Sequence, residues 1–176
     1  LIRRCEAKAT CKYVGLPEGN WHFQNLPFYE TGTIEKNPMG EADVQITIDL
    51  LNKLQPHQVY CAGDFADPHG THKVCFDVVI EALKRLKAQT SEQWINDCWL
   101  WLYKGAWQEW DITEIEMAIP MSPDQLSHKL DAVQKFQSHT LPDLLGGGRN
   151  QETARVYDSL GTAEYEAIEA FRSWQG

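Results

Sequence analysis

Two histidines stand three residues apart in the segment ADPHGTHKVC, which runs from Ala66 to Cys75. His69 and His72 follow the apolar run HQVYCAG and come at the head of a segment with helical character. Side chains at positions i and i+3 face the same side once the chain enters a helical turn. Neutral imidazole is the commonest nitrogen ligand of zinc, and a catalytic zinc site needs about three protein ligands. The pair therefore indicates either part of a metal site or a polar Asp-Pro turn before a helix.

Other chemistry-bearing motifs give weaker signals. The remaining histidines form no clear pattern for a third ligand, and no G-x-G-x-x-G, Walker A or G-x-S-x-G motif is present. The stretch LGGGR has no strand before it, and the acidic stretch WQEWDITEIE favours a solvated surface. A nucleophilic Cys–His pair, for example Cys61 near His72, stays open as a rival to a metal site.

The composition limits the class of protein. A hydrophobic fraction of 43% and a charged fraction of 23% over 176 residues are typical of one soluble domain. The net charge of −9 argues against nucleic-acid binding. Five cysteines without a C-x-x-C motif indicate free thiols in a reducing cytoplasm. Neither a membrane-spanning run nor a signal peptide is visible, so we expect a cytoplasmic protein without membrane contact.

The hydrophobic pattern predicts alternating helices and strands. The expected helices cover 1–14, 41–54, 73–88, 123 to about 138, and 151–160; the expected strands cover 20–28, 58–62, 98–103 and 115–121. Such alternation indicates an α/β fold with a mainly parallel sheet. Ligands of such sheets bind at the carboxyl ends of the strands, so we expect His69 and His72 at the carboxyl edge of the strand Gln58–Ala62.

Several stretches together resemble one family. The run QPHQVYCAGDFADPHGTHKVC, the opening RRCEA and the ending EYEAIEAF resemble the LmbE/PIG-L family of zinc-dependent N-acetylglucosamine deacetylases. YKGAWQEWDI and GTAEYEAIEAF are also similar to the deacetylase-like half that some bacteria fuse to a glucosamine-6-phosphate deaminase-like domain. The resemblance implies one domain over residues 1–176 with a three-layer, Rossmann-like sheet flanked by helices. It implies an amino sugar or sugar phosphate as the small-molecule partner.

The resemblance also implies roles for individual residues. His72 would be a zinc ligand, and protonated His69 would stabilise the oxyanion that forms at the acetyl carbonyl. Asp67 would hydrogen-bond His69. Arg3 would bind a hydroxyl or phosphate of the substrate, and Trp107 would pack against the sugar ring. Each of these last three also has a structural explanation, namely an Asp-Pro turn, a solvated helix arginine and a core tryptophan.

Two features depart from the family pattern. The motif A-H-P-D-D, which supplies two zinc ligands and the general base in the family, is absent, and the loop reads H-G-T-H instead of H-P-D-H, with Thr71 in place of an acid. Because the chain also opens inside a helix without Met, we expect a fragment that lacks its N-terminal strand and is inactive alone. An open sheet edge would favour homo-oligomers. A non-catalytic sugar-binding or structural domain, fused to a deaminase-like domain, is the alternative.

Overall fold

The computed structural model describes residues 2–33, 35–66, 70–104, 109–137 and 167–174. Contacts divide the chain into two compact units. The first unit comprises residues 1–23 and 109–170, and the second comprises residues 24–108 and 171–176. The expected organisation as one domain stays a prediction. None of the helices in the described ranges combines the length and apolar character needed to cross a bilayer.

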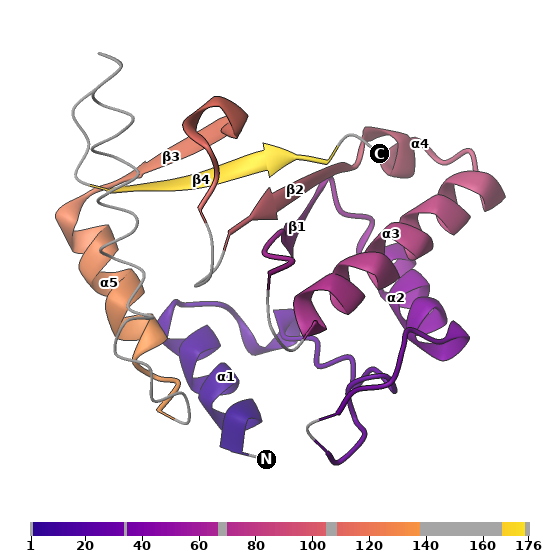
Figure 1. The fold of residues 1–176 in the computed structure, drawn as a ribbon, viewed down its shortest axis with the longest axis horizontal. Coiled ribbons are helices and arrows are strands. Elements are labelled where there is room, and N and C mark those ends of the chain that lie inside the picture. The colour runs from indigo at the N-terminus through magenta and orange to yellow at the C-terminus, as the bar shows by residue number, and fades with distance from the viewer. Residues whose placement is uncertain (1, 34, 67–69, 105–108, 138–166, 175–176) are drawn as a thin grey trace. The chain divides into compact units, whose positions relative to one another are not determined.

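Helices and strands alternate along most of the described chain (Figure 1). They are α1 (Ile2–Tyr13), α2 (Glu41–Leu54), β1 (Gln58–Ala62), α3 (Thr71–Gln89), α4 (Gln93–Asp97), β2 (Trp99–Tyr103), β3 (Met117–Met121), α5 (Pro123–Val133) and β4 (Ala167–Ser173). Short 3-10 turns cover Glu18–Asn20 and Ile112–Glu114. The α/β class is thereby confirmed.

The strands lie in the order β1-β2-β4-β3. β1 and β2 are parallel, with Tyr60 opposite Trp101, whereas β2 and β4 are antiparallel, with Trp101 opposite Ser173. The sheet is therefore mixed, and the expectation of a mainly parallel sheet is not confirmed. The difference comes from the C-terminal strand β4, which runs antiparallel to β2.

In the second unit, α3 packs on β1 and α2 packs on α3. Apolar side chains at helical spacing on α2 and α3 are buried, and so are the alternate residues Leu100 and Leu102 of β2. This core contains Val44, Ile48, Leu51, Phe76, Val78, Ala82, Leu83, Leu86, Leu100 and Leu102. The carboxylate of Asp43 is buried at the start of α2, where Oδ1 accepts the backbone N–H of Phe28 at 3.0 Å and Oδ2 accepts that of Gly40 at 2.8 Å.

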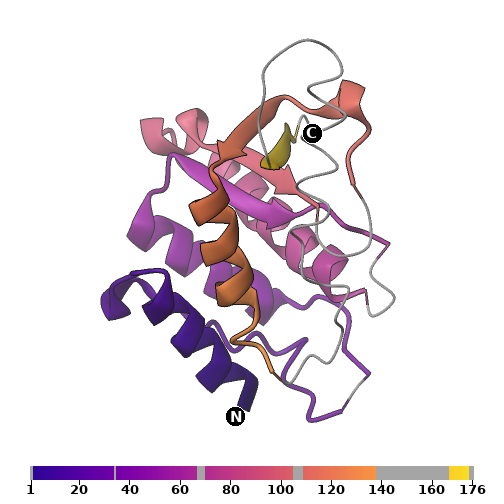
Figure 2. The same cartoon turned by 90° about the vertical axis from the view of Figure 1, so that its left-hand side faces the viewer.

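The first unit is built on the contact between α1 and α5, which lie side by side in Figures 1 and 2. The hydroxyl of Tyr13 donates to Asp131 at 3.0 Å, and its ring stacks on His128 with centroids 4.5 Å apart.

The sequence predicted the start of α5 correctly. Ser122 accepts the N–H of Gln125, and the side chain of Gln125 accepts the N–H of Ser122, so the two residues form a capping box.

One expected element is not found within the described residues. The strand expected over 20–28 does not form: Asn25 has a φ of 52°, outside the extended region, and the segment begins with a 3-10 turn. The C-terminal strand β4 and the short helix α4 were not foreseen. The helix expected over 151–160 lies outside the described residues.

Candidate active site

The β1–α3–β2 segment places His72 at the carboxyl end of β1. The helices α3 and α4 connect β1 to β2, and these two strands are parallel. The helix α3 therefore starts at the carboxyl end of β1 and runs back along the sheet (Figure 1). His72 is the second residue of α3 and half-buried. Gly70 caps the helix with a φ of 65°, and no atom lies within 4 Å of where its Cβ would be. The left-handed backbone, not lack of space, therefore favours glycine at this turn.

A buried carboxylate lies at the same end of β1. Asp64 follows the strand by two residues and is 0% exposed. The N–H of the preceding Gly63 donates to the carbonyl of Tyr103 at 2.7 Å, which ties the start of the loop to the end of β2. An ionised carboxylate is costly to bury, so a fully buried one at a sheet edge is a candidate for function. Asp64 was not among the residues predicted from the sequence; the signal for it is an Asp two residues after an apolar strand.

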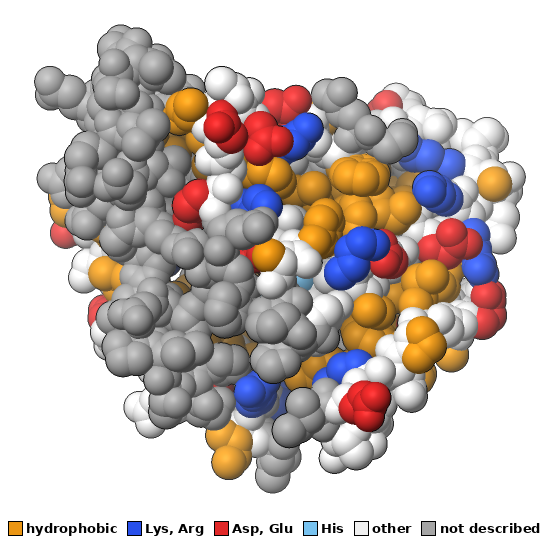
Figure 3. All heavy atoms as spheres, viewed as in Figure 1, with side chains coloured by type: hydrophobic (Ala, Val, Ile, Leu, Met, Phe, Trp, Pro, Cys, Tyr) orange, Lys and Arg blue, Asp and Glu red, His pale blue; other side chains and the backbone are white. Residues whose placement is uncertain are grey.

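Aromatic rings gather beside the first turns of α3. Phe76 lies between Phe65 and Trp174, with ring centroids 4.9 Å away on each side. Lys73 forms an ion pair with Asp77 at 2.5 Å, and its ammonium lies 5.8 Å from the ring of Phe65. Figure 3 shows apolar side chains with charged ones among them on the face over β2 and α3. Such rings provide flat apolar surface near His72.

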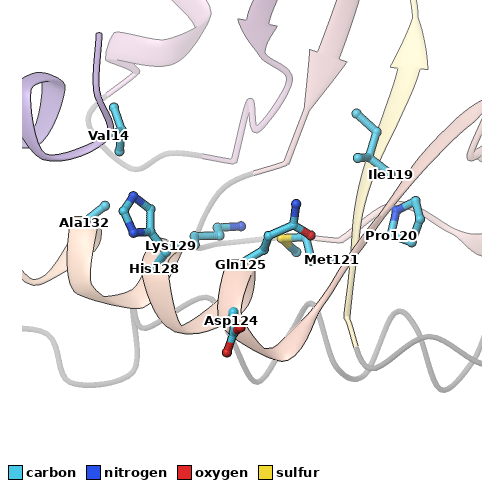
Figure 4. Close-up of a pocket in the computed structure, with 9 residues that line it drawn as sticks. All are labelled: Val14, Ile119, Pro120, Met121, Asp124, Gln125, His128, Lys129 and Ala132. Carbon is cyan, nitrogen blue, oxygen red and sulfur yellow. The ribbon is translucent and has the colours of Figure 1, made fainter.

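The cavity drawn in Figure 4 belongs to the first unit. It has a volume of about 520 Å³ and lies between β3, α5 and the end of α1. Three of its polar groups have protein contacts: Lys129 pairs with Glu169, His128 stacks on Tyr13, and Gln125 belongs to the cap of α5. The carboxylate of Asp124 also lines the cavity. The cavity therefore offers apolar walls, formed by Val14, Ile119, Pro120, Met121 and Ala132, and we assign it no catalytic role.

The predicted site residues fall in different parts of the chain. Only His72 lies in the described part of the histidine loop; His69, Asp67 and Trp107 lie outside the described residues. Arg3 is exposed on α1, which belongs to the first unit, whereas His72 belongs to the second. The roles of all five residues stay predictions.

A zinc site can be tested only against the described side chains. Within these ranges, no group of three or more His, Cys, Asp or Glu residues is arranged to hold a metal ion. His72 is the single predicted ligand that the described residues contain. The described residues by themselves therefore do not fit a catalytic zinc ion, which needs about three protein ligands.

The chain is similar in sequence to one known protein. The chain is 48% identical over 182 aligned residues to a glucosamine-6-phosphate deaminase-like protein of Bacteroides thetaiotaomicron. The alignment covers 97% of this chain and 27% of that protein, so the chain spans about a quarter of the relative's length. No family model matches the chain.

Solved structures share the fold. The chain superposes on N,N'-diacetylchitobiose deacetylase of Pyrococcus horikoshii with a TM-score of 0.58 and 18% identity, covering 98% of this chain and 63% of that one. For 4-carboxy-2-hydroxymuconate hydratase of Pseudomonas putida the TM-score is 0.67, the identity 15%, and the coverage 99% and 72%. A conserved protein of Thermus thermophilus gives a TM-score of 0.66 and 16% identity, with coverage of 99% and 73%. These neighbours include a deacetylase and a hydratase, so the fold alone does not select the reaction.

A nucleophilic cysteine at Cys61 is disfavoured by its surroundings. Burial, with a smaller contribution from Cys75, raises the pKa of the Cys61 thiol to about 12, so the thiol stays protonated at neutral pH. Cys61 is therefore expected to react with iodoacetamide at pH 8 roughly a thousandfold more slowly than an ordinary cysteine. Peptide mass spectrometry over a time course measures this rate, with the exposed Cys5 as reference. Labelling of Cys61 as fast as Cys5 would restore the Cys–His hypothesis.

Proposed function

We propose that the natural protein containing this chain hydrolyses the N-acetyl amide of an N-acetylglucosamine-type amino sugar. The observation that carries the proposal is the position of His72, in the first turn of α3 after β1, in a fold shared with a chitobiose deacetylase. The relative named for glucosamine-6-phosphate deaminase supports an amino sugar or its phosphate as substrate.

Each predicted residue has a defined task in this reaction. His72 would contribute one ligand to zinc, with the remaining ligands supplied from outside the described residues. With His72 and those further ligands holding it, zinc would supply a water nucleophile at neutral pH. His69, protonated, would donate a hydrogen bond to the developing oxyanion, a contribution of about 3 to 4 kcal/mol in comparable sites. Asp67 would orient His69.

Two further residues would hold the substrate. The planar guanidinium of Arg3 suits a sugar hydroxyl or a phosphate, since it offers paired donors. Trp107 would stack on the apolar face of the pyranose ring. The buried side chain of Asp64 lies at the same end of β1 as His72.

A non-catalytic sugar-binding or structural domain is the second candidate. The observation in its favour is Thr71, which begins α3 where the deacetylase-like pattern has an acidic residue. An acid next to a metal-ligating histidine commonly fixes the orientation of the ring, and threonine carries no charge for this purpose. This domain would bind an amino sugar without cleaving it.

Acetate release separates the two candidates. The natural full-length protein is expected to release acetate from N-acetylglucosamine or its 6-phosphate, and a zinc chelator is expected to stop the reaction because the nucleophile is lost. An enzymatic acetate assay with and without chelator, followed by zinc addition, measures this. Saturable sugar binding by calorimetry without acetate release would instead support the non-catalytic domain.

A further inference from the structure

Three aromatic rings form one contiguous group in the second unit. Phe65 comes from the loop after β1, Phe76 from the second turn of α3, and Trp174 from the position directly after β4. The ring centre of Phe76 lies 4.9 Å from that of Phe65 and 4.9 Å from that of Trp174. We call these three residues the ring cluster. All of them belong to the same compact unit as His72.

The ring cluster adjoins the helical turn that carries His72. Phe76 follows His72 by four residues on α3, so the two side chains lie on the same side of the helix, one turn apart. Phe65 belongs to the loop that leads from β1 to the start of this helix. A ligand bound at His72 therefore has the ring cluster beside it.

The two outer rings of the cluster are open to solvent, whereas the middle ring is buried. Phe65 is 39% exposed and Trp174 is 41% exposed, but Phe76 is only 4% exposed. The plane of Phe76 makes an angle of 51° with that of Phe65 and of 79° with that of Trp174, so Phe76 stacks flat on neither ring. The buried ring thus supports two outer rings whose faces stay available for a further contact.

The charged groups beside the cluster balance each other. The ammonium of Lys73 lies 2.5 Å from the carboxylate of Asp77 and 5.8 Å from the ring centre of Phe65. The pair offers hydrogen-bond donors and acceptors without net charge. Apolar ring faces next to such a pair suit a sugar ring, which has apolar C–H faces and hydroxyl groups at its edge. A phosphate would instead have to compete with Asp77 for the ammonium of Lys73.

We propose that the ring cluster binds a second, uncharged sugar ring of the substrate, next to the amino sugar whose amide is cleaved. This inference rests on the proposed function and narrows its substrate class to neutral glycosides of N-acetylglucosamine with at least two rings. Phe65 and Trp174 determine this specificity, because their exposed faces stack on the second ring, and Phe76 holds them in place.

Calorimetric titration of the natural full-length protein measures this binding. N,N'-diacetylchitobiose is expected to bind about tenfold more tightly than N-acetylglucosamine, because its second ring gains the contact with Phe65 and Trp174. Equal affinities for the two sugars overturn the proposal.

Substitutions within the cluster locate the second ring. W174A and F65A are each expected to weaken binding of N,N'-diacetylchitobiose about fivefold and to leave binding of N-acetylglucosamine and its 6-phosphate within about twofold, since these ligands have no second ring. W174Y keeps a flat ring and is expected to retain most of the affinity. Phe65 lies in a loop, so F65A provides the test if W174A proves unstable.

The matched control for these variants is W99A. Trp99 is also an exposed tryptophan of the second unit, but its ring stacks on Trp101 and not on the ring cluster. W99A is therefore expected to leave the affinity for both sugars unchanged. A loss in W99A as large as that in W174A contradicts the proposal, and so does an equal loss of monosaccharide and disaccharide binding in W174A.

The first unit of the chain is a competing occupant of the two outer rings. Hydroxyl-radical footprinting of the full-length protein distinguishes it from a sugar, with each native oxidation rate divided by the rate in denaturant. Trp174 is expected to react faster than Phe28, a core ring that is 2% exposed, and to slow only when N,N'-diacetylchitobiose is added. A Trp174 as protected as Phe28 without sugar overturns the proposal.

Acetate release from the same sugars separates this proposal from the proposed function. If N,N'-diacetylchitobiose binds through the ring cluster but no acetate is released from any of the sugars, the deacetylase is overturned and the ring cluster is supported as part of a sugar-binding domain. If acetate is released with equal kcat/KM from N-acetylglucosamine and from N,N'-diacetylchitobiose, the deacetylase is supported and the role of the ring cluster is overturned.

Discussion

If the full-length protein has the proposed zinc-dependent deacetylase activity, replacing His72 by alanine is expected to lower that activity by at least about 100-fold and to remove most of the zinc. A catalytic zinc ion has about three protein ligands, so the loss of one weakens binding and changes the charge that activates water. Alanine is the best helix former, so the first turn of α3 is expected to persist. Zinc content by mass spectrometry and the rate of acetate release measure the two effects.

His22 offers the matched control for this prediction. It is exposed in the first unit, and the substitution His22→Ala is expected to leave zinc content and activity unchanged. Full zinc content in the His72 variant would show that His72 is not a ligand, even if activity falls. Unchanged activity as well as unchanged zinc would remove His72 from the site and leave the sugar-binding alternative.

The local sequence pattern predicted the bounds of some helices and strands correctly. The bounds of β1 and α2 agree with the sequence prediction because each has a clear apolar pattern, which ends before Pro56 in α2 and before Gly63 in β1. The Ser122-Pro123 signal predicted the start of α5 because capping depends only on neighbouring residues. Features of this kind are decided within a few residues along the chain.

Other parts depend on contacts that a sequence does not display. β4 contains alanine and glutamate, which favour helices, yet it is a strand because it lies between β2 and β3 in the sheet. The burial of Asp64 likewise results from packing at the end of β1, so the pattern alone indicated only a loop residue. The antiparallel pairing of β2 with β4 likewise depends on contacts far apart in the chain, so the expectation of a mainly parallel sheet is not confirmed.

The Asp43 carboxylate is the other position where a large effect is expected. It is 2% exposed and accepts two backbone N–H groups, from Phe28 and from Gly40, so it joins the segment before α2 to the first turn of that helix. In Asp43→Ala both donors lose a charged acceptor, and the N–H of Phe28 is left in a buried environment. The free energy of unfolding is expected to fall by about 3 kcal/mol.

Urea denaturation of Asp43→Ala, Asp43→Asn and a surface control tests this expectation. The asparagine variant would keep one acceptor oxygen and place an amide against the second N–H, so its loss should be about half as large. The control is Asp49→Ala on the same helix, where the carboxylate is exposed and accepts a hydrogen bond from Gln45. Its effect should stay within about 0.5 kcal/mol. Equal midpoints for the Asp43 and Asp49 alanine variants would mean that the buried carboxylate does not hold the start of α2 in place.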